Sequence, residues 1–455
     1  MFSINELIEA TKGKLIGKVE ILTIKGISID TRTILPQDAF IAIKGNNFDG
    51  HDFIDEAIRK GAGCIISEPA RKAQGSAGKV TFIEVRDTIK ALGDIARFQR
   101  RRFGIPVIAV TGSNGKTTVK EMIAHTLSKR FKILRNEGTK NNHIGLPLTL
   151  LNLNSTHDIA VLEIGTNHFG EVRYLSGVCQ PNIGIITNIG PSHLEYLRDL
   201  EGVFREKYSM LEGLKSPRIA ILNADDDLLR KKALIKSGKE IFFSFGIKSR
   251  CDFSASAARN LDDKIKFRVN KKYKFTLNTP GYYNIYNALA AIAVARIFGI
   301  GHKDIISRLN TFDFPQGRLK ILELNSIKFI DDTYNSNPLS LQQALKALAN
   351  FRTRGRKIFV MGDMLELGSR AEPLHHQAGR DIAACCDVLI TVGNLSRLAA
   401  EAARACRFDA KNIFSCENCR QAREILFNKL SLEKGDLVLV KGSRSMKMEE
   451  VFKKG

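Results

Sequence analysis

One stretch near residue 110 constrains the fold of this chain more than any other. Residues 107–111 (VIAVT) are small or apolar, as expected of a buried strand, and a glycine-rich turn follows them. Val119, Met122 and Ile123 then recur at helical spacing. Strand, glycine loop and helix form a geometry that binds phosphate, because backbone N–H groups and the helix N-terminus face the anion together. The stretch therefore predicts a nucleotide-binding α/β domain.

The loop itself, residues 111–118 (TGSNGKTT), supplies the expected phosphate and metal contacts. Lys116 is expected to reach the outer phosphates of ATP, and the hydroxyl of Thr117 to bind Mg²⁺. Val110 stands where the usual G-x-x-x-x-G-K-[ST] loop has its first glycine, so an ordinary glycine-rich turn with a solvated lysine is the alternative. The residues predicted to bind the nucleotide here are Gly112, Ser113, Asn114, Gly115, Lys116, Thr117 and Thr118.

Length and composition predict a multidomain globular protein. With 455 residues the chain is too long for one compact core, and 44% of its residues are hydrophobic. No apolar run is long enough to span a bilayer, and the first residues lack the basic and apolar regions of a secretory signal. We therefore expect a cytoplasmic protein with no transmembrane segment. Its eight cysteines are scattered and are expected to be reduced.

The net charge of +22 favours polyanionic partners, but its distribution does not favour nucleic acid. The basic residues are spread along the chain, and no basic tail or aromatic-basic module of the RNA-binding kind is present. A phosphorylated substrate is the simpler explanation, and a basic host proteome is another. We therefore expect no nucleic acid partner.

The order of apolar runs predicts an α/β fold of three domains. Residues 1–104 alternate short strands, such as 27–33 and 39–45, with helices, of which 88–102 is the last. Residues 105–315 repeat a βαβ pattern, which predicts a mostly parallel, phosphate-loop-type central sheet with helices on both faces. From about residue 316 to 455 the pattern starts again as a dinucleotide-fold-like (Rossmann-like) domain.

Two chemical groups follow predicted strands of the central domain. Glu163 ends the strand 159–164, and His193 follows the strand 183–188 through a Gly-Pro turn. Ligands of open α/β sheets bind at the carboxyl ends of the strands, so both groups are candidates for a metal site. The alternatives are a surface carboxylate and a structural histidine.

Ten motifs of this chain resemble those of the Mur ligase family, the ATP-dependent amide-forming enzymes of bacterial cell-wall synthesis. They span nearly the whole chain, and the compact loop with Val110 agrees with the family pattern. Three of them, at 331–338, 362–368 and 441–449, favour the member that adds a dipeptide. The motifs are IDTR (29–32), FDGH (48–51), TGSNGKTT (111–118), NNHIG (141–145), EIGTNH (163–168), NIGPSHLE (188–195), NIYNALAA (284–291), DDTYNSNP (331–338), GDMLELG (362–368) and KGSRSMKME (441–449).

The resemblance implies a reaction and its substrates. The carboxylate of UDP-N-acetylmuramoyl-tripeptide attacks the γ-phosphate of ATP, and the amine of D-alanyl-D-alanine displaces phosphate from the acyl phosphate. The metal ligands implied are Thr117, Glu163, His193 and Lys207, the last as a carbamate formed from CO₂. Carbamylation requires a neutral amine, which burial favours; the alternative for Lys207 is an ordinary helix-surface lysine. We expect a monomer whose domains close during turnover.

The same resemblance assigns further site residues. Asn287 corresponds to an adenine contact, and Arg318 and Asp332 to phosphate and ribose contacts from the third domain. The catalytic set is Lys116, Lys207, His193 and Glu163. The substrate contacts are Thr31, Arg32, Asn46 and His51 for UDP, Asn142 and His143 for the muramoyl group, and Asn335.

Other activities remain as alternatives at this stage. The Mur ligase that adds the preceding residue, or a folylpolyglutamate-type relative, shares the loop but fits the three late motifs less well. A nucleic-acid-stimulated ATPase is suggested only by the charge, and it predicts stimulation that weakens steeply with salt.

Overall fold

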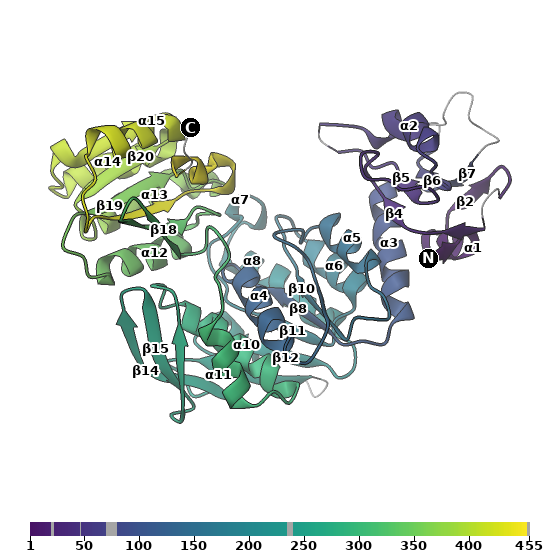
Figure 1. Cartoon of the computed structure of the whole chain (residues 1–455), viewed down its shortest axis with the longest axis horizontal. Coiled ribbons are helices and arrows are strands. Elements are labelled where there is room, and N and C mark those ends of the chain that lie inside the picture. Colours follow the sequence, from purple (N-terminus) through teal and green to yellow (C-terminus); the bar gives the residue numbers. More distant parts are fainter. Residues whose placement is uncertain (20–21, 46, 70–79, 234–239, 453–455) are drawn as a thin grey trace.

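The computed structural model describes residues 1–19, 22–45, 47–69, 80–233 and 240–452. Figure 1 shows three domains side by side along the longest axis, in chain order. Among the described residues, no helix is both long enough and apolar enough to cross a membrane. Each of the eight cysteines is free, as predicted.

The first domain is built on a five-stranded sheet of order β2-β7-β6-β5-β4, in which only β2 is antiparallel to its neighbour. The predicted strands at 27–33 and 39–45 are shorter than expected. Asp30 accepts from the N–H of Arg32 at 2.9 Å, so a side-chain-capped turn replaces the ladder there. The elements are β1 Phe2–Ser3, α1 Ile4–Thr11, β2 Lys14–Ile16, β3 Thr23–Ile24, β4 Ile27–Ser28, β5 Ala39–Ile41, η1 Gly50–Phe53, α2 Ile54–Arg59, β6 Cys64–Ser67, β7 Thr81–Glu84 and α3 Thr88–Arg102.

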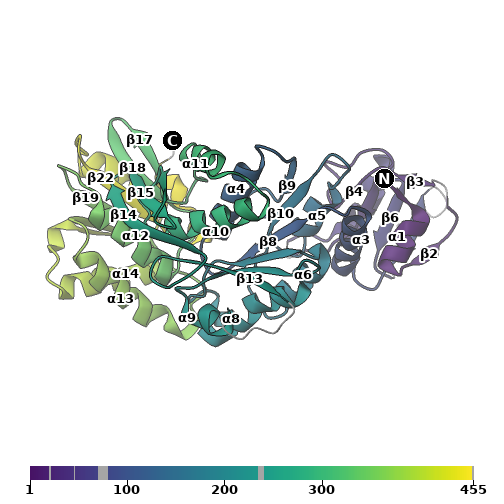
Figure 2. The same cartoon turned by 90° about the horizontal axis from the view of Figure 1, so that it is seen from below.

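Helix α3, whose bounds are as predicted, joins the first two domains. Leu92 and Ile95 lie in the core of the first domain, whereas Ala96 belongs to the core of the second. Asp87 caps the helix by accepting from the N–H of Lys90 at 2.9 Å. Figure 2 shows α3 between the first sheet and the central one.

The central domain contains a nine-stranded sheet of order β16-β15-β14-β13-β12-β11-β8-β10-β9. Its strands from β9 to β14 are parallel, and β14, β15 and β16 form an antiparallel extension. The elements are β8 Val107–Thr111, α4 Lys116–Leu127, β9 Ile133–Arg135, α5 Gly145–Leu151, β10 Ile159–Glu163, α6 Glu171–Cys179, β11 Ile183–Ile186, α7 Leu194–Leu197, α8 Leu200–Tyr208, η2 Ser209–Gly213, β12 Ile219–Asn223, α9 Asp227–Ala233, β13 Ile241–Gly246, β14 Phe253–Leu261, β15 Lys264–Val269, β16 Tyr273–Leu277, α10 Asn284–Ile297 and α11 His302–Asn310.

Helices cover both faces of this sheet, as predicted for parallel strands. Along β8, Ile108 and Val110 enter the core under α4 and α10, while Val107 and Ala109 enter the core on the other face. Figure 2 shows α10 and α11 on one side of the strands and α8 and α9 on the other. Because both faces are buried, the strand is continuously apolar rather than alternating.

The third domain has a six-stranded sheet of order β17-β18-β22-β19-β20-β21, parallel except for β17. The α/β prediction is therefore confirmed for the main sheet of each domain. The elements are β17 Lys320–Leu324, β18 Ile327–Asp332, α12 Pro338–Asn350, β19 Lys357–Gly362, η3 Gly368–Arg370, α13 Ala371–Ala383, β20 Val388–Val392, α14 Asn394–Ala405, η4 Ala410–Asn412, β21 Ile413–Cys416, α15 Cys419–Glu424, η5 Ile425–Lys429, β22 Leu437–Lys441, η6 Arg444–Met446 and η7 Met448–Val451.

Candidate active site

The glycine loop turns sharply between β8 and α4. Gly112 has φ +146° and Gly115 has φ +85°, conformations that side-chain-bearing residues rarely adopt. A Cβ atom on Gly112 would collide with the hydroxyl of Thr187, and one on Gly115 with the side chain of Asn287. Both glycines are therefore required by backbone conformation and by close packing.

The loop is fixed to the residues that follow β11. Ser113 Oγ donates to the carbonyl of Gly190 and accepts from its N–H, both at 2.9 Å. The N–H of Asn114 donates to Asn188 Oδ1 at 3.0 Å. Asn188 was not among the predicted site residues, although the motif at 188–195 contains it. Thr118 is buried behind the loop.

Lys116 and Thr117 begin α4 beneath the loop. The ammonium of Lys116 donates to the carbonyls of Gly112 and Ser113 at 2.9 and 3.3 Å. Burial lowers the pKa of Lys116, the Glu163 carboxylate opposes this shift, and Arg318 reinforces it. Thr117 is buried, and its hydroxyl accepts from Arg318 Nη2 at 3.3 Å.

Glu163 ends β10 beside the loop, and it is 1% exposed. Its Oε1 accepts from Asn141 Nδ2 at 2.6 Å, whereas its Oε2 is buried and has no hydrogen-bond partner. A buried carboxylate oxygen without a partner is costly unless a ligand completes it, and carboxylate oxygen suits Mg²⁺. This oxygen fits the predicted metal role.

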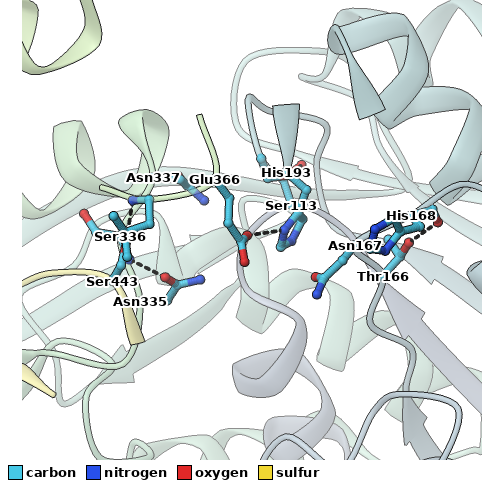
Figure 3. A network of polar contacts seen from close by, with 12 residues as sticks. Ser113, Thr166, Asn167, His168, His193, Asn335, Ser336, Asn337, Glu366 and Ser443 are labelled. Carbon is cyan, nitrogen blue, oxygen red and sulfur yellow. Dashed lines mark hydrogen bonds and ion pairs between the residues drawn. The ribbon is translucent and has the colours of Figure 1, made fainter. Parts of the chain in front are cut away.

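His193 lies at the other side of the same edge, in a left-handed conformation with φ +53°. Its Nδ1 lies 2.6 Å from Oε2 of Glu366, a residue of the third domain (Figure 3). Burial lowers the pKa of His193, and the hydrogen bond to Glu366 opposes that shift. In this conformation a carboxylate from another domain occupies one ring nitrogen of the predicted metal ligand.

Lys207 lies on α8 and is 1% exposed, so it is not the helix-surface lysine of the alternative interpretation. Burial lowers the pKa of Lys207 well below its ordinary value, and the nearby charge of Lys116 lowers it further. Its neighbour Glu206 accepts from the N–H groups of Gly170 and Val172 at 2.7 and 2.8 Å. Carbamylation needs the neutral amine, which this shift favours.

The third domain presents three of the predicted residues. The guanidinium of Arg318 lies 3.6 Å from the ring centroid of Tyr334, which orients it toward Thr117. Asp332 is buried and accepts from the ammonium of Lys441 at 2.6 Å. Asn335 is exposed, and its Oδ1 accepts from the N–H of Ser336 at 2.8 Å. Figure 3 shows the segment 335–337 facing the loop residue Ser113 across the site.

A cavity of about 640 Å³ separates the central and third domains. Asn287, buried on α10, reaches it beside the loop. Of the predicted residues, those that line it are Ser113, Asn114, Gly115, Lys116, Thr118, Glu163, His193, Asn287, Arg318, Asp332 and Asn335. The structure thus brings together residues from the central and third domains.

The predicted UDP contacts lie in the first domain, away from this cavity. Thr31 is buried and its carbonyl accepts from Lys60 Nζ at 2.8 Å, while Arg32 is exposed and pairs with Asp30. That pair lowers the pKa of Asp30 to about 2. His51 Nδ1 bonds Asp49 at 2.7 Å and its Nε2 accepts from the N–H of Glu68 at 3.2 Å, so both ring nitrogens are already engaged. Asn46 lies outside the described residues.

The predicted muramoyl contacts, Asn142 and His143, do not line the cavity either. Asn142 Oδ1 accepts from the N–H groups of Ile144 and Gly145 at 3.2 and 2.9 Å, which caps α5. The adjacent Asn141, which sequence reasoning left unassigned, is the residue that contacts Glu163. The sequence signal for Asn141 was its place in the same motif.

Two more residues missed by sequence reasoning link the domains. Asn337 Nδ2 donates to Asn114 Oδ1 at 2.8 Å, and Glu366 pairs with His193.

Over the described part of the chain, no group of three or more His, Cys, Asp or Glu side chains could hold a metal by itself. The proposed metal set therefore depends on Thr117 and a modified Lys207 as well as Glu163 and His193.

Comparisons with known proteins identify the family to which this fold and site belong. Family models match three successive segments: "Mur ligase family, catalytic domain" at 23–100, "Mur ligase middle domain" at 110–295, and "Mur ligase, glutamate ligase domain" at 317–444. The chain belongs to the Mur ligase family, whose resemblance was noted from its motifs.

Several of the similar proteins are named as ligases of D-alanyl-D-alanine. The UDP-N-acetylmuramoyl-tripeptide–D-alanyl-D-alanine ligase of Bacillus subtilis is 32% identical over 99% of this chain and 97% of its own length. A crystal structure of MurF from Acinetobacter baumannii has a TM-score of 0.89 at 31% identity, covering 99% of this chain and 98% of that one. MurF from Thermotoga maritima, solved in complex with ADP, has a TM-score of 0.82 at 28% identity over 94% and 96% of the two chains.

Proposed function

We propose that this chain is an ATP-dependent ligase that joins D-alanyl-D-alanine to UDP-N-acetylmuramoyl-tripeptide in peptidoglycan precursor synthesis. The observation that carries the proposal is the cavity in which Lys116, Glu163 and Arg318 meet. The names of the relatives, matched along their whole length, support the choice of acceptor and dipeptide. The products are the extended peptide, ADP and phosphate.

The cavity suits transfer of a phosphoryl group between two anions. The acceptor carboxylate and the γ-phosphate of ATP repel each other, so cations must neutralise the charge that develops. Lys116 and Arg318 line the cavity from opposite domains and supply that charge. The amine of the dipeptide then replaces phosphate on the acyl carbon, forming the amide bond.

Mg²⁺ is proposed to be held by Thr117, Glu163, His193 and Lys207, the last as a carbamate. The partnerless Oε2 of buried Glu163 supports a cation at this place. Bound there, Mg²⁺ would neutralise phosphate charge as a Lewis acid. The pKa of Lys207, lowered by burial, supports carbamate formation because the shift favours the neutral amine. A carbamate carbon signal after addition of ¹³C-bicarbonate, lost in Lys207→Met, would be the direct test.

The remaining contacts are proposed as follows. Asn287 contacts adenine, Asp332 contacts ribose, and the loop residues 112–118 hold the phosphates. Thr31, Arg32, Asn46 and His51 bind UDP; because the His51 ring nitrogens are engaged internally, its role is to shape the site or to rearrange on binding. Asn142 and His143 contact the muramoyl group, and Asn335 is a further substrate contact.

We further propose that residues 1–104, 105–315 and 316–455 act as three domains of a cytoplasmic monomer. The separate main sheet of each domain and the apolar cores that pack on these sheets support these divisions.

The proposed function is tested by phosphate release from Mg-ATP with UDP-N-acetylmuramoyl-tripeptide as acceptor. The amine is varied among D-alanyl-D-alanine, D-alanine, L-lysine and none. We expect release that requires both the acceptor and the dipeptide, and that is lost in Lys116→Ala. Lys129→Ala, which changes an exposed lysine just beyond α4, is the matched control.

Two results would contradict the proposal. Release with L-lysine but not with the dipeptide would indicate a ligase for the preceding residue. Phosphate release that does not depend on the acceptor but increases with RNA would indicate a nucleic-acid-stimulated ATPase.

A further inference from the structure

A buried lysine that the proposed reaction does not use lies one helical turn beyond Lys116. Lys120 is completely buried on α4, yet it does not line the cavity. Its ammonium donates to the carbonyl of Asn136 at 2.5 Å and to that of Gly138 at 3.3 Å. Its only ion pair among the described residues is with Glu121, at 2.8 Å. A buried cation is costly, and this one is directed at the loop that follows β9.

Asn136, the first residue after β9, is also completely buried. Its Oδ1 accepts from the N–H of Glu163 at 2.9 Å, and its Nδ2 donates to the carbonyl of Glu163 at 3.1 Å. Strand β9 pairs with β10 only as far as Arg135 and Val161. The side-chain amide of Asn136 therefore takes the place of the next backbone hydrogen bonds between β9 and β10. It fixes the backbone of Glu163 where the strand pairing stops.

Asn141 acts on the side chain of the same glutamate. Its Nδ2 donates to Oε1 at 2.6 Å, and its own carbonyl accepts from the N–H of Gly165 at 2.9 Å. A Cβ atom on Gly165 would collide with the Asn141 side chain, so the two residues pack closely. One carboxylate oxygen is thereby satisfied, and the other, Oε2, is left without a partner.

We propose that Lys120, Asn136 and Asn141 are positioning residues that hold Glu163 for a divalent cation at Oε2. Lys120 fixes the loop, Asn136 fixes the glutamate backbone, and Asn141 fixes the rotation of the carboxylate. The inference deepens the proposed function, on which it rests, because the cation is the one that accompanies the nucleotide. Residues that hydrogen-bond to metal ligands orient those ligands, and their substitution commonly weakens metal binding by about 10- to 100-fold.

The test measures metal binding rather than catalysis. Mn²⁺ and ADP are titrated with the intact protein, and bound Mn²⁺ is followed by its electron paramagnetic resonance signal. We expect Asn141→Ala and Lys120→Met to weaken Mn²⁺ binding about 10-fold or more. The thermal midpoint of each variant is recorded in the absence of ligand.

Matched controls separate this effect from a loss of structure. Asn152→Ala removes an exposed amide that bonds only the carbonyl of Leu148, and Lys129→Met removes an exposed ion pair. Both are expected to bind Mn²⁺ as the wild type does. If Lys120→Met does not fold, half-buried Asn141 provides the decisive variant through Asn141→Ala.

The outcomes are distinguishable from failure of the proposed function. Unchanged Mn²⁺ affinity in Asn141→Ala, with or without a lower thermal midpoint, would overturn the positioning role while leaving the ligase proposal intact. Absence of ADP-dependent Mn²⁺ binding in the wild type would overturn both.

Discussion

The two walls of the cavity are built differently. On the central-domain side, Glu163 and Ser113 are buried and held by hydrogen bonds within one domain. On the opposite side, Asn335 and Glu366 are exposed, and the third domain reaches the central one through polar contacts between side chains. Figure 3 shows the contact between His193 of the central domain and Glu366 of the third.

From this difference we propose that one wall is organised before substrates bind and that the other is assembled by domain closure. A buried network within a domain persists as long as the domain is folded. Contacts between half-exposed polar groups contribute little each, so they form and break as the domains move. The pair between His193 and Glu366 is one such contact, and it engages Nδ1 of the predicted metal ligand.

The largest effect is expected on the preorganised wall. Lys116→Ala should lower kcat by at least about 10³-fold, because the cation acts directly on transferring phosphate. Stability should not fall correspondingly, since the substitution removes a half-buried charge. Single-turnover phosphate release and thermal unfolding measure the two quantities. A loss confined to KM would show that Lys116 contributes only to ground-state binding.

A smaller loss, of about 10²-fold in kcat/KM, is expected for Arg318→Ala on the assembled wall. Arg318→Lys should recover little, because a lysine cannot keep both the stack on Tyr334 and the contact with Thr117. Steady-state kinetics with varied ATP measures this. Full activity of the lysine variant would show that charge alone, without the planar geometry, is sufficient.

The same contrast explains how far the sequence could predict the site. The loop 111–118, Glu163 and His193 were predictable because carboxyl ends of parallel strands meet at one edge. The partners Glu366 and Asn337 were not, since they lie 173 and 223 residues away from the groups they contact. Their positions depend on how two domains are packed, which no local pattern contains.

Other predicted residues have local partners that compete with the role implied by the motif, and their substrate contacts stay predictions. Asn142 satisfies the first turn of α5, and His51 is engaged at both ring nitrogens. Lys120 and Asn136, by contrast, have no distinctive sequence signal, although they are completely buried. Burial of a polar side chain is a property of the folded chain, so coordinates were needed to find them.

A third, smaller effect concerns closure. Asn337 caps α12 through the N–H of Ser340 at 2.9 Å and also donates to Asn114. Asn337→Asp keeps the cap but loses the donor, so we expect an unchanged thermal midpoint and a several-fold higher KM for ATP. Small-angle scattering should show the wild type compacting with an ATP analogue plus acceptor, and the variant compacting less. Equal compaction of the wild type and the variant would show that the contact between Asn337 and Asn114 does not contribute to domain closure.

The smallest effect is a pH dependence confined to the assembled wall. His375 is completely buried on α13; its Nε2 accepts from the N–H of Met364 at 3.0 Å, and its Nδ1 donates to the carbonyl of Ala371 at 2.7 Å. It therefore holds the segment that carries Glu366. Burial lowers the pKa of His375 below its ordinary 6.5. The charge of Asp363 raises this pKa, and that of His376 lowers it further.

The sign of the dependence follows from linkage. Because the unfolded chain has the higher histidine pKa, it binds more protons as the pH falls below about 6.5, and the native arrangement loses stability there. Hydrogen exchange at 364–367, corrected for intrinsic rates, should therefore quicken between pH 7.5 and 5.5, while exchange at 112–116 changes less. His375→Gln should abolish the pH-dependent difference. Equal acceleration of exchange at both segments would show that acid destabilises both walls of the cavity to the same extent. That result would contradict the proposed difference between the walls.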